Sequence, residues 1–116
     1  MIRVLVSGAD GRMGSETVKA VLADNELEFV GGTSLMNVGK DAGEVIGISS
    51  LGLPLYGSLN EALKMAKPDV VVDFTTPAAI YGNVKTCIEN GTNIVVGTTG
   101  LTAQQRNELD EAAKKA

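Results

Sequence analysis

Residues 2–14 read Ile2-Arg3-Val4-Leu5-Val6-Ser7-Gly8-Ala9-Asp10-Gly11-Arg12-Met13-Gly14. A short apolar run of strand length ends in a turn with glycine at every third position, and a helical pattern follows. In this context Gly8 permits the tight turn, Gly11 lets the backbone approach a phosphate, and Gly14 lets the helix pack against the strand. The stretch therefore predicts a dinucleotide-binding turn, with free helix amides facing the phosphates. Its G-x-x-G-x-x-G spacing leaves a glycine turn without a ligand as the alternative.

Apolar runs and helical patterns alternate along the rest of the chain. We expect strands at Ile2–Val6, Leu27–Val30, Pro54–Tyr56, Val70–Phe74 and Ile94–Val96. We expect helices at Arg12–Ala23, at Ser58–Ala66, from Pro77 to the Asn90-Gly91 stop, and from Thr102 onward, whereas residues 31–52 show no regular pattern. The sequence thus predicts an α/β fold of the Rossmann type. It would be doubly wound, with a mostly parallel five-stranded sheet in the order 3-2-1-4-5 between two layers of helices.

The composition limits the classes of function. With 116 residues, of which 44% are hydrophobic and 21% charged, we expect one domain over residues 1–116. A net charge of −4 without a basic stripe argues against nucleic acid as a partner. No apolar run approaches the ~20 residues that cross a bilayer, so we expect no membrane association. The single cysteine forms no internal disulfide, which favours a reducing compartment, and we expect the cytoplasm.

Residues just beyond the predicted strands are the remaining candidates, because ligands of open α/β sheets bind at the carboxyl ends of the strands. The second strand leads into Thr33-Ser34-Leu35, without the carboxylate that commonly accepts the ribose 2′-hydroxyl of NAD. A 2′-phosphate would be repelled less there, and we expect NADPH to bind at least as well as NADH; a loosely held adenosine is the alternative. The last two strands lead into residues 74–77 and 97–100, where small and hydroxylated side chains leave room for a flat ring.

Several of these residues also have a plainer interpretation. Arg12 in the first helical turn can be explained as a solvated surface arginine. Asp10 can stabilise the turn as well as contact a ligand. Cys87 lies on the apolar face of its predicted helix, which indicates packing more than reactivity. Asp73 ends a buried strand and suits a structural or capping role. The chain contains no histidine, and we identify neither a catalytic residue nor a metal site.

Taken in order, the motifs of the chain resemble those of one enzyme family. The resemblance is carried by VSGADGRMG at residues 6–14, VVDFTTP at 71–77 and VVGTTGLT at 95–102, with KDAGE at 40–44 in support. These segments are similar to dihydrodipicolinate reductase, an NAD(P)H-dependent family of the diaminopimelate route to lysine. The similarity spans essentially all 116 residues. Gly-Thr-Thr-Gly combined with the Arg-Met-Gly turn is far more specific than either motif alone.

The resemblance implies roles for named residues toward NADPH or NADH. The pyrophosphate and adenosine side would meet Gly8, Ala9, Asp10, Gly11, Arg12 and Met13. Phe74 and Thr75 would approach from the neighbouring strand, and the nicotinamide would be lined by Gly97, Thr98 and Thr99. Ser34 and Leu35 stand where some members carry an acidic residue and an arginine for the ribose, so the resemblance does not fix the choice between the two cofactors.

The resemblance also implies a second domain. Members of the family place a catalytic histidine and lysine in a His-His-x-x-Lys-x-Asp motif of a C-terminal domain, and this chain has no histidine. We therefore expect residues 1–116 to be the cofactor domain, without the substrate domain, which would be its partner. On its own this domain is not expected to catalyse the reaction. A stand-alone nucleotide- or CoA-binding module with a regulatory or carrier role is the alternative.

Overall fold

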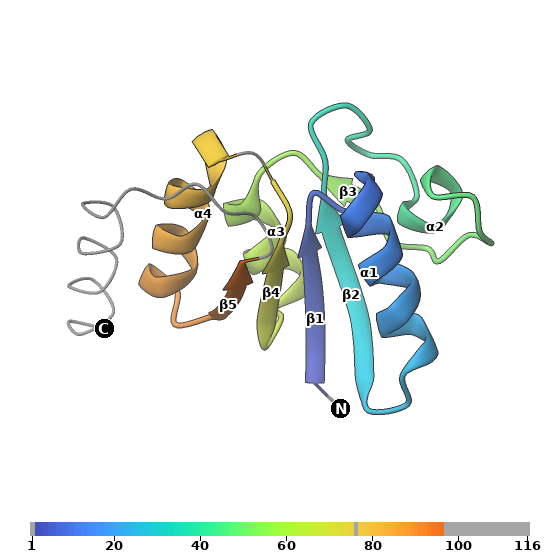
Figure 1. The fold of residues 1–116 in the computed structure, drawn as a ribbon, viewed down its shortest axis with the longest axis horizontal. Helices are drawn as coiled ribbons and strands as arrows, with labels where there is room; N and C mark the ends of the chain where they lie inside the picture. Colours follow the sequence, from blue (N-terminus) through green and yellow to red (C-terminus); the bar gives the residue numbers. More distant parts are fainter. Residues whose placement is uncertain (1, 76, 97–116) are drawn as a thin grey trace.

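The computed structural model describes residues 2–75 and 77–96, which alternate between strands and helices (Figure 1). The strands are β1 (Ile2–Ser7), β2 (Leu27–Thr33), β3 (Leu55–Tyr56), β4 (Val70–Asp73) and β5 (Asn93–Val96). The helices are α1 (Arg12–Ala23), α2 (Ala42–Val45), α3 (Leu59–Ala66) and α4 (Pro77–Glu89). The expected helix from Thr102 onward lies outside the described residues.

The five strands form one sheet in the order β3-β2-β1-β4-β5, and every neighbouring pair of these strands is parallel. This confirms the predicted doubly wound order. The chain leaves β1 toward one edge of the sheet and returns after β3 to build the other edge, so right-handed crossovers place the helices before and after this reversal on opposite faces. In Figure 1, α1 lies across β1 and β2, and α3 and α4 lie on the other side of the sheet.

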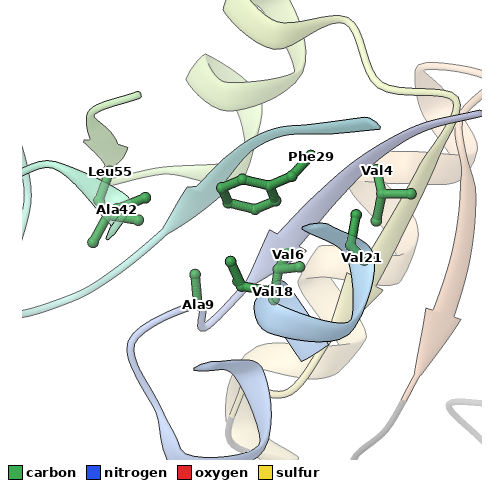
Figure 2. Packing of buried hydrophobic residues seen from close by; sticks show 8 residues of the cluster. All are labelled: Val4, Val6, Ala9, Val18, Val21, Phe29, Ala42 and Leu55. Carbon is green, nitrogen blue, oxygen red and sulfur yellow. The ribbon is translucent and has the colours of Figure 1, made fainter. Parts of the chain in front are cut away.

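Side chains that alternate along β1 divide the core into two halves. Val4 and Val6 pack with Val18 and Val21 of α1, and Phe29 belongs to the same cluster (Figure 2). Leu5, which points to the opposite face, belongs to a second cluster. That cluster contains Val30, Leu59, Ala62, Leu63, Ala66, Val71 and Cys87. The centre of the sheet at β1 is therefore buried on both faces, which explains why this strand is a continuous apolar run.

Helix boundaries follow the predicted capping signals where these are described. The Ser58 side chain accepts a hydrogen bond from the Glu61 amide at 3.1 Å, and α3 begins at the next residue, Leu59. Beyond the end of α4, Gly91 has a φ of +68°, the left-handed conformation expected of a glycine cap. Thr76, which the sequence predicts as the N-cap before Pro77, lies outside the described residues. In the described part of the chain, no helix is long and apolar enough to cross a membrane.

Residues 31–52 are more ordered than the sequence pattern indicated. β2 continues through two glycines to Thr33, and α2 forms a single turn at Ala42–Val45. The Asp41 carboxylate caps α2 by accepting hydrogen bonds from the amides of Gly43 and Glu44. The expectation of an irregular stretch was therefore wrong at residues 31–33 and 42–45, because glycine in β2 and the shortness of α2 hide the usual periodicity.

Candidate functional site

The glycine turn connects β1 to α1 and gives the site its shape. Gly8 has a φ of +77°, which L side chains rarely adopt. A Cβ atom on Gly14 would overlap the carbonyl oxygen of Gly8, and it would lie 3.1 Å from the Cα of Ala9. Gly8 and Gly14 therefore have structural reasons to be glycine, as the sequence predicted.

Gly11 has no such structural reason. Its φ of −75° suits any residue, it is exposed, and a Cβ atom there would meet only the Gly8 carbonyl oxygen at an ordinary 3.4 Å. Gly11 is also the N-cap of α1 and offers no side chain to the first amides of the helix. The first amides of α1, among them those of the exposed residues Arg12 and Met13, therefore receive no hydrogen-bond acceptor from an N-cap side chain.

Hydrogen bonds join the glycine turn to the end of β2. The Ala9 amide donates to the Thr33 carbonyl oxygen at 3.0 Å, and the Gly8 amide donates to the Thr33 side-chain oxygen at 3.1 Å. The hydroxyl groups of Ser7 and Thr33 lie 3.1 Å apart in the core. Thr33 was missed as a site-building residue, and the available signal was a hydroxyl side chain two glycines beyond the predicted strand Leu27–Val30. Because of these bonds, the turn and the end of β2 form one surface.

Asp10 extends from the turn across the end of β2. Its Oδ2 atom accepts hydrogen bonds from the Ser34 hydroxyl at 2.7 Å and from the Asn37 side-chain amide at 2.6 Å. The Ser34 oxygen in turn accepts from the amides of Met36 and Asn37. Burial acts to raise the pKa of Asp10, but the hydrogen bonds from Ser34 and Asn37 outweigh it and lower the pKa below its usual value. Asp10 thus stabilises the turn as an ionised carboxylate.

The end of β4 lies beside the same turn. The Phe74 amide donates to the Ser7 carbonyl oxygen at 3.0 Å, and a Cβ atom on Gly8 would sit 3.4 Å from the Thr75 methyl carbon. The fully buried Asp73 carboxylate accepts from the Thr75 amide at 2.8 Å, from the Thr75 hydroxyl at 2.6 Å and from the Asn83 side chain at 3.1 Å. This confirms the structural role predicted for Asp73, which fixes Thr75 against α4.

The structure therefore brings most of the predicted cofactor residues together at the carboxyl ends of the strands. Residues 8–13 lie next to Ser34 on one side and next to residues 74–75 on the other. Ala9 is almost wholly buried, and the Ser34 side chain is turned toward Asp10, so these two residues face the core and the turn. The predicted nicotinamide residues Gly97, Thr98 and Thr99 lie outside the described residues.

In the part of the chain that the structure describes, the remaining reactive side chains do not form a second centre. Cys87 is fully buried, as expected, and burial together with the nearby Asp73 charge raises the pKa of its thiol to about 11. Among residues 2–75 and 77–96, no group of three or more histidine, cysteine or acidic side chains is placed to hold a metal ion.

Comparison with known proteins identifies the family to which this architecture corresponds. The family model described as "Dihydrodipicolinate reductase, N-terminus" matches residues 2–116. A 4-hydroxy-tetrahydrodipicolinate reductase of Listeria monocytogenes is 48% identical over 113 residues, and one of Methanocaldococcus jannaschii is 43% identical over 120 residues. The alignments cover 97% and 99% of this chain but only 43% and 44% of the two relatives. The chain thus spans less than half the length of these relatives.

A solved structure shows the same relationship in three dimensions. The dipicolinate-bound dihydrodipicolinate reductase of Paenisporosarcina sp. TG-14 superimposes with a TM-score of 0.84 at 31% sequence identity. The match covers 99% of this chain and 44% of that protein. The predicted order of strands and helices is therefore the one found in a reductase of this type.

Proposed function

The chain belongs to the dihydrodipicolinate reductase family through its N-terminal nucleotide-binding domain, and on this premise we propose that residues 8–13 hold the pyrophosphate of NADH or NADPH. The family and its Rossmann fold imply a nicotinamide dinucleotide cofactor, which supplies a hydride when bound. Residues 1–116 would act as one dinucleotide-binding domain. The amides of Arg12 and Met13 would donate to phosphate oxygens at the positive end of α1.

The observation that carries this proposal is the character of Gly11. Neither its backbone angles nor its neighbours require a glycine, and the residue is exposed at the helix start. A ligand close to the backbone accounts for the missing side chain. The Gly11 amide itself donates to the Gly8 carbonyl oxygen at 3.2 Å, so we assign the phosphate contacts to the next two amides and not to Gly11.

The remaining residues divide between the two ends of the cofactor. Phe74 and Thr75 stand beside Gly8 and would contact the middle of the dinucleotide. Gly97, Thr98 and Thr99 follow β5 in the sequence, and we propose that they line the nicotinamide. Ser34 would act through Asp10, because its hydroxyl donates to that carboxylate.

The activity of a full-length protein is a further step of the same proposal. Together with the part of the relatives that this chain does not span, the domain would serve reduction of a 4-hydroxy-tetrahydrodipicolinate substrate in lysine biosynthesis. That additional part is the partner we expect for the domain. A cytoplasmic location agrees with the single, buried and unpaired cysteine.

The experiment is a titration of the wild type and Gly11→Val with NADH, NADPH and CoA. Valine places carbon where a phosphate would lie, and overpacking of about 1–3 kcal/mol corresponds to roughly 5- to 150-fold weaker binding. Gly82→Val is the matched control, because Gly82 is exposed on α4 and a Cβ atom there meets nothing within 4 Å. Unchanged affinity in Gly11→Val would overturn this placement, and tighter binding of CoA than of either dinucleotide would favour the carrier module.

A further inference from the structure

The end of β2 lacks a carboxylate of its own. In dinucleotide-binding folds an acidic residue about 20 positions after the glycine motif accepts a hydrogen bond from the adenosine ribose. Ser34 occupies that place here, and no acidic residue occurs between Glu28 and Asp41. The Ser34 hydroxyl is buried and already donates to Asp10 while accepting from two backbone amides, so it has little capacity left for a ligand.

The neighbouring acidic residue along the chain is committed elsewhere. The Asp41 carboxylate accepts hydrogen bonds from the amides of Gly43, Glu44, Leu51 and Leu53. These bonds hold it in the loop around α2. Asp41 is therefore a structural residue of that loop and does not supply the ribose acceptor.

Asp10 brings a negative charge to the same place from the opposite direction. Its side chain extends from the glycine turn toward the residues that follow β2. Its Oδ2 atom lies 2.7 Å from the Ser34 hydroxyl and 2.6 Å from the side-chain amide of Asn37. Both bonds go to Oδ2, and a carboxylate has about four lone-pair sites, so Oδ1 keeps capacity to accept. The side chain is only partly buried, so part of it remains accessible from outside the protein.

From this geometry we infer that Asp10 is the specificity-determining residue for the adenosine ribose, accepting a hydrogen bond from its 2′-hydroxyl and thereby favouring NADH over NADPH. The inference rests on the proposed dinucleotide site. A 2′-phosphate at this position would bring its negative charge against an ionised carboxylate. A preference for NADH is the reverse of the one expected from the sequence. That expectation rested only on the residues that follow β2 in the chain.

The test compares the dissociation constants of NADH and NADPH for the wild type, Asp10→Asn, Asp24→Asn and Arg12→Gln. In Asp10→Asn the amide oxygen takes the place of Oδ2 and keeps both hydrogen bonds, while the charge is lost. Asp24→Asn removes one charge at the other end of α1 and serves as the matched control. Arg12→Gln removes the exposed cation of the first turn.

The wild type is expected to bind NADH more tightly, and Asp10→Asn should shift the affinity ratio toward NADPH by about two- to fivefold, as for a partly exposed charge contact. Asp24→Asn should keep the wild-type ratio. The inference is overturned if both cofactors bind and Asp10→Asn leaves their ratio unchanged, or if only Arg12→Gln alters it. Absence of binding by either cofactor in all four proteins would instead overturn the dinucleotide site itself. Matching circular dichroism spectra verify that each variant folds.

Discussion

Gly11 and Gly14 lie in the same turn, three residues apart, and only one of them has a structural reason to be glycine. At Gly14 a Cβ atom would overlap the Gly8 carbonyl oxygen, so the constraint comes from the fold. At Gly11 the backbone angles suit any residue and a Cβ atom would make only an ordinary contact, so the constraint that we propose there is the bound cofactor. On this proposal, a substitution at Gly14 tests stability and a substitution at Gly11 tests binding.

Gly14→Ala is expected to destabilise the domain by about 1–3 kcal/mol, because α1 must move away from β1 to admit one methyl group. Urea unfolding followed by circular dichroism measures this as a lower transition midpoint at an unchanged slope. Gly82→Ala is the control and should be neutral or slightly stabilising, since it replaces an exposed helical glycine. Equal midpoints for Gly14→Ala and the wild type would show that the turn accommodates a side chain.

At the scale of the elements, the loop between β2 and β3 is organised by one carboxylate. Asp41 caps α2 and also accepts from the amides of Leu51 and Leu53, on the far side of the loop. The hydrogen bond from the Glu44 amide, followed by those from the far side, lowers the pKa of Asp41 from 3.8 to about 2 against the opposing effect of desolvation. The loop therefore depends on the ionised form of Asp41.

The lowered pKa of Asp41 predicts a specific dependence of stability on pH. Because the folded pKa lies below the unfolded value, the stabilisation is fully present above about pH 4 and is lost as the pH falls toward about 2. Asp41→Asn should be less stable than the wild type at pH 7, and the difference in unfolding free energy between the two should shrink over this interval. Asp24→Asn is the control, and a pH-independent difference for Asp41→Asn would contradict the prediction.

The sequence predicted those elements whose periodicity or capping is local. Val4, Leu5 and Val6 alternate between two apolar clusters, which is why a continuous run indicated a doubly covered strand. The signal for α2, an acidic cap at Asp41 followed by Glu44, was present but attached to only four helical residues. The Asp10–Ser34 bond joins residues 24 positions apart, and nothing in the local pattern specifies which way the Asp10 side chain turns.

At the scale of the whole molecule, the parallel sheet places the carboxyl ends of β1, β2 and β4 side by side, and the candidate site lies there. Both carboxylates described there act as hydrogen-bond acceptors. Asp10 is held ionised by Ser34 and Asn37, and both oxygens of the buried Asp73 accept hydrogen bonds. Neither Asp10 nor Asp73 is placed to donate a proton to a substrate. This end of the sheet, as far as it is described, is therefore suited to holding a cofactor.

The last prediction is that the 116-residue polypeptide on its own binds cofactor without reducing substrate at an enzyme-like rate. Reduction requires a proton donor as well as a hydride, and general acid catalysis alone contributes about 10²–10⁴ in rate. The sequence contains no histidine, and the carboxylates described above act as acceptors. The measurement is oxidation of NADH or NADPH at 340 nm with the substrate proposed above, beside the full-length Listeria relative as positive control. Turnover above about 1 s⁻¹, the lower end of ordinary enzymes, would show that these residues complete a catalytic site by themselves.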